Sequence, residues 1–107
     1  MTHVSTHVLD ATTGRPAADI AVTLSEAGGE IVAESTTDDD GRIADLCTVA
    51  LTGVYRLRFD TASFFAARHV TGFYPEVVIT FEITDPAGNY HVPLLLSPYA
   101  YSTYRGS

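Results

Sequence analysis

The chain contains no lysine, so six arginines carry its basic side-chain charge against thirteen acidic residues, and the net charge is −7. Without a cluster of basic residues the chain offers no electropositive face to nucleic acid or to anionic lipid, and we expect neither as a partner. The acidic residues form no long tail either, because their densest run is Asp38 to Asp40.

Cysteine and long apolar runs are equally scarce. Cys47 is the only cysteine, so no internal disulfide can form, and its apolar neighbours favour a structural thiol over a reactive one. No segment is apolar over the length needed to cross a membrane, and the first residues lack the basic and apolar regions of a signal peptide. We therefore expect a cytoplasmic protein.

Several catalytic motifs are also missing. The chain has no G-x-S-x-G nucleophile motif, no glycine-rich phosphate loop and no dinucleotide-binding pattern. His3 and His7 have the spacing of a helical metal pair, but they lie in a predicted strand, where residues four apart are roughly 13 Å from each other. We therefore expect no metal at this pair, and a hydrolase with this sequence would use water as its nucleophile.

What the chain does contain is a succession of short β-rich segments. Turn sequences such as Gly28-Gly29, Asp40-Gly41 and Ser97-Pro98 separate them, at a spacing typical of an all-β sandwich. Apolar and polar residues alternate within the segments, which indicates one buried face. The exception is the segment 60–69, where an N-cap candidate and helix-tolerant residues predict one short helix. At 107 residues we expect a single domain, residues 1–107.

Two histidines lie in the first and last of the longer predicted strands. His7 falls on the face opposite Thr6 and Val8, and His91 falls on the face opposite Val92. An imidazole on a face turned away from the core can accept and return a proton near neutral pH. For either histidine taken alone, a half-exposed strand residue with a hydrogen bond is the simpler interpretation.

The segment 90–96 is apolar on both faces, which is typical of a strand enclosed between the core and a further layer. In a sandwich this small we expect the further layer to be another subunit. Pro93 donates no backbone hydrogen bond, so the hydrogen-bond ladder should be interrupted there.

Two arginines occupy unusual places. Arg42 follows a tight turn, where it can present a fixed cation at a pocket; taken alone, it is also explained as a solvated residue that neutralises the aspartates before it. Arg105 lies two residues from the end of the sequence. Tyr99, Tyr101 and Tyr104 give this segment apolar area with which to dock, so we expect an anchored tail where a frayed one is usual.

Four blocks along the whole chain carry a family resemblance: Ser5-Thr-His-Val-Leu-Asp10 with Gly14-Arg-Pro16, Asp40-Gly-Arg42, Phe73-Tyr-Pro-Glu76, and Tyr90-His-Val-Pro through Tyr104-Arg-Gly-Ser107. Together they resemble the transthyretin-related family. The middle two blocks are unspecific alone, whereas the first and last are specific in combination. The Tyr-Arg-Gly-Ser ending is similar to that of the enzymatic branch, the 5-hydroxyisourate hydrolases, and absent from transthyretin itself.

The resemblance implies a transthyretin-like sandwich of two four-stranded sheets with one short helix, assembled as a homotetramer with active sites between dimers. It implies His7, Arg42 and His91 as catalytic residues, and no metal or organic cofactor. The implied reaction opens 5-hydroxyisourate to 2-oxo-4-hydroxy-4-carboxy-5-ureidoimidazoline in urate breakdown, with histidine-activated water and an arginine-stabilised oxyanion. Which histidine is the base stays open. The implied substrate-binding residues are Ser102, Tyr104, Arg105, Gly106 and Ser107.

Two non-enzymatic functions compete with this one. A transthyretin-like carrier of a small aromatic ligand would share the fold, and a structural sandwich domain of a larger protein is the second alternative. The polar set of His7, Arg42, His91 and Arg105 favours the enzyme over the carrier, because a carrier needs no such groups. The absence of any linker argues against the structural domain.

Overall fold

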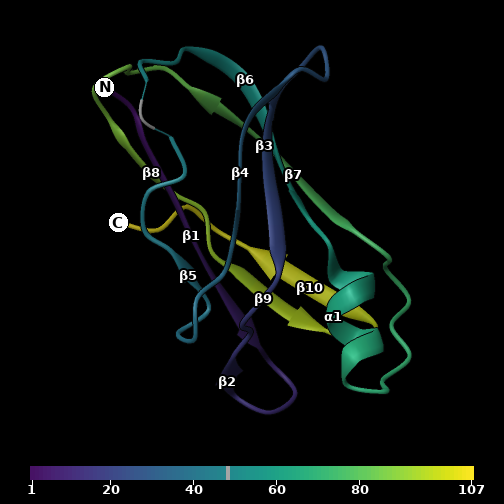
Figure 1. The fold of residues 1–107 in the computed structure, drawn as a ribbon. Helices are drawn as coiled ribbons and strands as arrows, with labels where there is room; N and C mark the ends of the chain where they lie inside the picture. The colour runs from purple at the N-terminus through teal and green to yellow at the C-terminus, as the bar shows by residue number, and fades with distance from the viewer. Residues whose placement is uncertain (48) are drawn as a thin grey trace.

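Two β-sheets pack face to face in the computed structural model, which describes residues 1–47 and 49–107, and one helix lies at one end of the sandwich (Figure 1). This architecture confirms the all-β sandwich with one short helix that the sequence predicts. The core between the sheets is formed by the inward-facing residues of both layers.

The smaller sheet consists of four antiparallel strands in the order β4-β3-β6-β7. Leu24 and Leu57 pair in register on its inner face and are fully buried. Arg58 lies on the outer face and donates a hydrogen bond from Nε to a carboxylate oxygen of Glu76 at 2.7 Å. The four strands are β3 (Ala21–Glu26), β4 (Ile31–Thr36), β6 (Gly53–Phe59) and β7 (Val77–Ile83).

The larger sheet is built around the first long strand, β1. On one edge of β1 lie two parallel strands, with β10 beyond the second of them, and on the other edge lie two short antiparallel strands. The members are β1 (His3–Asp10), β2 (Arg15–Pro16), β5 (Arg42–Ile43), β8 (Asn89–His91), β9 (Leu94–Ser97) and β10 (Ala100–Thr103).

The strand count of this larger sheet differs from the prediction of two four-stranded sheets, because the sheet has six strands. The six strands occupy four positions across the sheet. Strands β8 and β9 lie end to end along one edge of β1, and β5 and β2 lie end to end along its other edge. The break between β8 and β9 contains Pro93, as predicted, because proline has no amide hydrogen to donate.

Strand β1 alternates between the core and the opposite face from Val4 to Val8. Val4 and Val8 are fully buried, and Thr6 is buried with its hydroxyl donating a hydrogen bond to the Val92 carbonyl at 2.6 Å. The odd-numbered residues, including His7, therefore lie on the opposite face, as the alternation predicts. His91 is on the corresponding face of β8, because it pairs in register with Ser5.

Helix α1 (Thr61–Ala67) is shorter than the predicted segment 60–69. Its N-cap is Asp60, whose carboxylate accepts a hydrogen bond from the Ser63 amide at 3.2 Å, and the chain leaves the helix before His69, which has a φ of 57°. His69 is exposed. No helix in residues 1–47 and 49–107 is long and apolar enough to cross a membrane.

The turn before β5 fixes the position of Arg42. Asp38 accepts hydrogen bonds from the amides of Asp40 and Arg42, each at 2.9 Å. Gly41 has a φ of 73°, and its carbonyl accepts a hydrogen bond from the Val8 amide at 2.7 Å. A Cβ atom at Gly41 would overlap the Val8 carbonyl oxygen. Glycine is therefore required both for the backbone angle and for the close approach of the turn to β1.

We expect Gly41→Ala to lower the free energy of unfolding by about 2–4 kcal/mol, because it adds steric overlap with β1 to the cost of a positive φ. Gly14→Ala is the matched control, since Gly14 has a φ of 75° and open space around it. That variant should lose only about 1 kcal/mol. Denaturant unfolding at equal protein concentration measures both. Equal losses would show that the contact with Val8 does not constrain the turn.

Candidate active site

Arg42, His7 and His91 come from three neighbouring strands of the larger sheet. His7 on β1 lies opposite Arg42 on β5, and Ser5, two residues earlier on β1, lies opposite His91 on β8. Residues two apart on a strand share a face, so these side chains all belong to the face turned away from the core. The structure thus brings together the three residues that the sequence suggested as catalytic.

A pocket of about 280 Å³ opens on this face. Arg42 and Ala44 border it from the β5 side, and His91 borders it from the other side of β1. His7 lies next to the pocket on β1 without lining it. The lining residues are Ser5, Thr6, Arg42, Ile43, Ala44, His91 and Ser107.

Arg42 is exposed and is available to a ligand. The ion pairs among residues 1–47 and 49–107 join His3 to Asp45 and Arg58 to Glu76, so Arg42 is in neither. Asp38 contacts the turn through backbone amides, as described above, and does not neutralise the guanidinium. This geometry argues against the simpler interpretation of Arg42 as a partner of the preceding aspartates.

The imidazole of His91 is held from two sides. Its Nδ1 atom lies 2.8 Å from the hydroxyl oxygen of Ser5, at hydrogen-bond distance. The backbone of Gly106 packs against the ring so closely that a Cβ atom there would overlap His91 Cδ2, and the Gly106 amide donates to the His91 carbonyl at 2.8 Å. Gly106, expected from the resemblance as a substrate-binding residue, therefore also positions the histidine.

The environment of His91 favours the neutral form of its side chain. Partial burial lowers the pKa of His91 below its usual value, and the positive charges of Arg42 and, to a smaller extent, His7 lower the pKa further. A neutral imidazole can accept a proton, so His91 is suited to act as a base near neutral pH.

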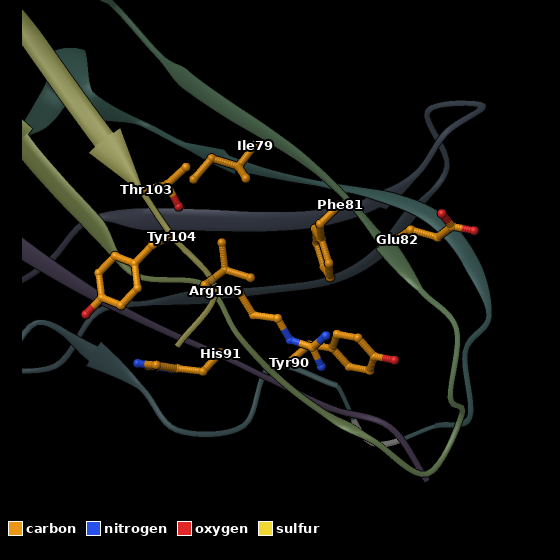
Figure 2. A pocket seen from close by; sticks show the side chains of 9 residues that line it. Ile79, Phe81, Glu82, Tyr90, His91, Thr103, Tyr104 and Arg105 are labelled. Atoms are coloured by element: carbon orange, nitrogen blue, oxygen red, sulfur yellow. The ribbon is translucent and has the colours of Figure 1, made fainter. Parts of the chain in front are cut away.

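Arg105 does not share the pocket of Arg42. Its guanidinium carbon lies 4.8 Å from the centre of the Tyr90 ring, and Figure 2 shows the side chain extended towards that ring. Arg105, Tyr104 and His91 line a second, largely apolar cavity of about 330 Å³. His91 thus borders both cavities, whereas Arg42 lines only the first of them and Arg105 only the second.

The C-terminal segment is anchored, but not by burial of its tyrosines. Tyr99 and Tyr104 are 68% and 60% exposed in the single chain, so their apolar area is not buried against residues of the same chain. The anchors are backbone pairing of β10 with β9, the Gly106–His91 bridge and the hydrogen bond from the Thr103 hydroxyl to the Pro93 carbonyl at 2.7 Å.

The remaining tail residues lie in two places. Ser107 lines the pocket with Arg42 and His91. Ser102 is exposed on β10, in register with Leu95, and borders a separate shallow pocket. The structure therefore brings Ser107 to the candidate site and leaves Ser102 away from it.

Among the described residues no three histidine, cysteine, aspartate or glutamate side chains are grouped as a metal ion requires. His3 has its Nδ1 atom 3.7 Å from a carboxylate oxygen of Asp45. What the pocket offers is an unpaired guanidinium beside a neutral imidazole with a second histidine nearby. Such a set can move a proton and stabilise a developing negative charge.

Sequence reasoning found His7, Arg42, His91 and Ser107 but gave no role to Ser5. Its contact with His91 depends on the parallel register of β1 and β8, which joins residues 86 positions apart. The two-residue period of a strand carries part of this information, because it puts Ser5 on the same face as His7.

Comparison with known proteins gives the family. A family model described as the HIUase/Transthyretin family matches residues 4–106. The 5-hydroxyisourate hydrolase of Caulobacter vibrioides is 42% identical over 115 aligned positions, which cover all of both chains. The structure of Klebsiella pneumoniae 5-hydroxyisourate hydrolase superposes with a TM-score of 0.92 at 38% identity and covers all of both chains. Transthyretin from Sparus aurata superposes with a TM-score of 0.88 at 33% identity, covering 96% of this chain and 95% of that one.

The pKa of His91 provides a test of the site's electrostatics. Arg42→Gln should raise the pKa of His91 towards its usual value, because a nearby positive charge is removed. The pKa of His91 should still stay below that value, because burial of the ring, the largest cause of the shift, is unchanged. Arg56→Gln, on the smaller sheet, is the control with the same change in net charge. NMR titration of the His91 ring measures both. An equal shift in the two variants would contradict a local effect of Arg42.

Proposed function

Because this chain belongs to the HIUase/transthyretin family, we propose that it hydrolyses 5-hydroxyisourate to 2-oxo-4-hydroxy-4-carboxy-5-ureidoimidazoline in urate breakdown. It is then a cyclic amide hydrolase. The observation that carries the proposal is the neutral, doubly held imidazole of His91 in one pocket with the unpaired guanidinium of Arg42.

In the proposed mechanism, His91 takes a proton from a water molecule while the water oxygen adds to the carbonyl carbon of the ring amide. Arg42 stabilises the negative charge that develops on the carbonyl oxygen, because a fixed cation needs no reorganisation during the reaction. The carbon–nitrogen bond then breaks, and the departing nitrogen receives the proton back. The carbonyl carbon becomes the new carboxyl group.

Between the two histidines, we assign the base to His91, since its ring is held on two sides and its pKa is lowered. His7 lies on the same face of the sheet, paired in register with Arg42. We assign His7 to shuttling the proton between the water and the departing nitrogen. Ser107 contacts the substrate directly from the pocket wall. We assign Arg105 and Tyr104 to binding the part of the substrate that extends past His91 into the second cavity. Ser102 can contribute to substrate binding only at a site that includes a neighbouring subunit.

We further propose a homotetramer in which the face carrying the site is covered by neighbouring subunits. All four residues of β10, Tyr101 among them, are exposed, as is Tyr99 just before the strand. The edge of β10 away from β9 has no partner strand in the described part of the chain. We place the protein in the cytoplasm, because its one cysteine is buried and free, which suits a reducing compartment.

The non-catalytic carrier is the alternative that the similarity to transthyretin raises. Burying His7, Arg42 and His91 around an aromatic ligand would cost desolvation energy, and a carrier catalyses no reaction that needs these polar groups. The polar set therefore favours the enzyme.

Replacing the histidines tests the chemistry. We expect His91→Ala and His7→Asn each to lower turnover of 5-hydroxyisourate by roughly 10²-fold or more, the range for loss of a general acid–base group. Neither residue is in the core, so the fold should survive. The assay follows the ultraviolet absorbance of freshly made 5-hydroxyisourate and subtracts its spontaneous decay.

His69→Asn is the control, because His69 is exposed, outside both sheets, and has a positive φ that asparagine accepts. It should retain the wild-type rate. If both site variants also retain it, the chemistry lies elsewhere; if the wild-type protein does not accelerate the decay at all, the proposed activity is refuted.

Deleting Tyr104 to Ser107 tests the tail. The deletion removes the Gly106 contact with His91 and the Ser107 side of the pocket, so we expect loss of most activity with the tetramer retained. Light scattering gives the mass and the absorbance assay gives the rate. A tetramer with full activity would show that the tail only packs, and a monomeric mass for the intact protein would refute the proposed assembly.

A further inference from the structure

Among the residues that the structure describes, Ser5 is the one polar side chain in hydrogen-bond contact with the His91 ring, and the mechanism above gives it no role. Its hydroxyl oxygen lies 2.8 Å from His91 Nδ1. The contact is fixed by the backbone, because Ser5 and His91 are register partners and the Val92 amide donates to the Ser5 carbonyl at 2.9 Å. A contact between two mobile surface side chains would have no such backbone support.

We infer that Ser5 is a positioning residue that accepts a hydrogen bond from His91 Nδ1 and so leaves Nε2 unprotonated and directed to solvent in the pocket. The inference deepens the proposed function and rests on it, because it concerns how His91 becomes a base. It assigns the base atom as well as the base residue.

The position of Nε2 supports this assignment. In the described part of the chain Nε2 has no protein hydrogen-bond partner, while every buried side-chain nitrogen and oxygen has one. Nε2 therefore reaches the solvent side, where water or substrate can meet it. An imidazole that is protonated at Nδ1 has its lone pair at Nε2, so the hydrogen bond to Ser5 selects the tautomer that can act as a base there.

A hydroxyl is suited to this task because it holds the tautomer without adding charge. The charged groups that lower the pKa of His91 are Arg42 on β5 and His7 on β1. The other titratable groups that line the second cavity with His91 are Glu82, Tyr90, Tyr104 and Arg105. A carboxylate at position 5 would attract a proton to the ring and would pair with Arg42. The serine hydroxyl accepts a hydrogen bond from Nδ1–H, so the proton stays on the ring, the imidazole stays neutral and the guanidinium stays free.

Serine beside histidine also occurs in nucleophilic dyads, in which the hydroxyl donates its proton to the ring and attacks the substrate. That role predicts a covalent acyl-enzyme on Ser5 and no activity without the hydroxyl as a nucleophile. The experiment below therefore separates a positioning hydroxyl from an attacking one.

The test compares Ser5→Ala, Ser5→Thr and the control Ser25→Ala in the full chain. Ser25 is also half-buried in a strand, but it lies on β3 in the other sheet. We expect Ser5→Ala to lower kcat by roughly 10- to 100-fold, as loss of the outer partner of a functional histidine does elsewhere, with KM nearly unchanged. Ser5→Thr, which keeps a hydroxyl, should recover most of the rate, and Ser25→Ala should match the wild type.

The second readout is ¹⁵N NMR of the His91 ring, which reports the tautomer whether or not the substrate is turned over. The wild type and Ser5→Thr should show a proton on Nδ1, and Ser5→Ala should show a mixture of tautomers. Melting temperatures establish that the variants are folded.

Unchanged kcat and tautomer in Ser5→Ala would overturn the inference, and so would a wild-type ring protonated at Nε2. A covalent acyl group on Ser5, seen by mass spectrometry after rapid quenching, would overturn it in favour of a nucleophile. If the wild type fails to hydrolyse 5-hydroxyisourate, the proposed function falls, and the tautomer measurement alone then decides whether Ser5 sets the protonation of His91.

Discussion

The hydrogen bond between the Gly106 amide and the His91 carbonyl is the contact on which the site depends. It returns the end of the chain to the sheet beyond the break at Pro93, and it brings the Gly106 backbone against the imidazole. With Ser5 on the other side, the ring has little freedom to rotate. A histidine that is already oriented loses little entropy when the reaction requires it, which is the advantage of a preorganised site.

The charges of the site follow from the same arrangement. The strand register places Arg42 and His7 next to each other and close to His91, and partial burial of the ring adds to their effect. His91 thus remains neutral beside a cation that no carboxylate in the described residues neutralises. The second cavity, beyond His91, is mostly apolar and contains the stacked pair of Arg105 and Tyr90, so polar and apolar binding regions meet at the imidazole (Figure 2).

Alternation in the sequence was sufficient to predict the strand faces, and therefore the outward position of His7 and His91, because the two-residue period of a strand is a local property. The family resemblance supplied Arg42, but its orientation depends on the contact of Gly41 with Val8, more than thirty residues away. The sequence indicated an anchored tail but not that Arg105 lies on Tyr90, since local sequence does not determine where a long, flexible side chain finds an aromatic ring. The Ser5 contact could not be predicted without the parallel register of β1 and β8.

A crystal structure with bound urate would test the account most directly, because urate presents the oxygens of an oxopurine and does not undergo the proposed hydrolysis. The account predicts urate in the pocket between β5 and β8, with an oxygen on the Arg42 guanidinium and the ring within hydrogen-bond reach of His91 Nε2. Urate bound only in the cavity against Tyr90, with no contact to Arg42, would contradict the central claim that Arg42 and His91 act on the same substrate.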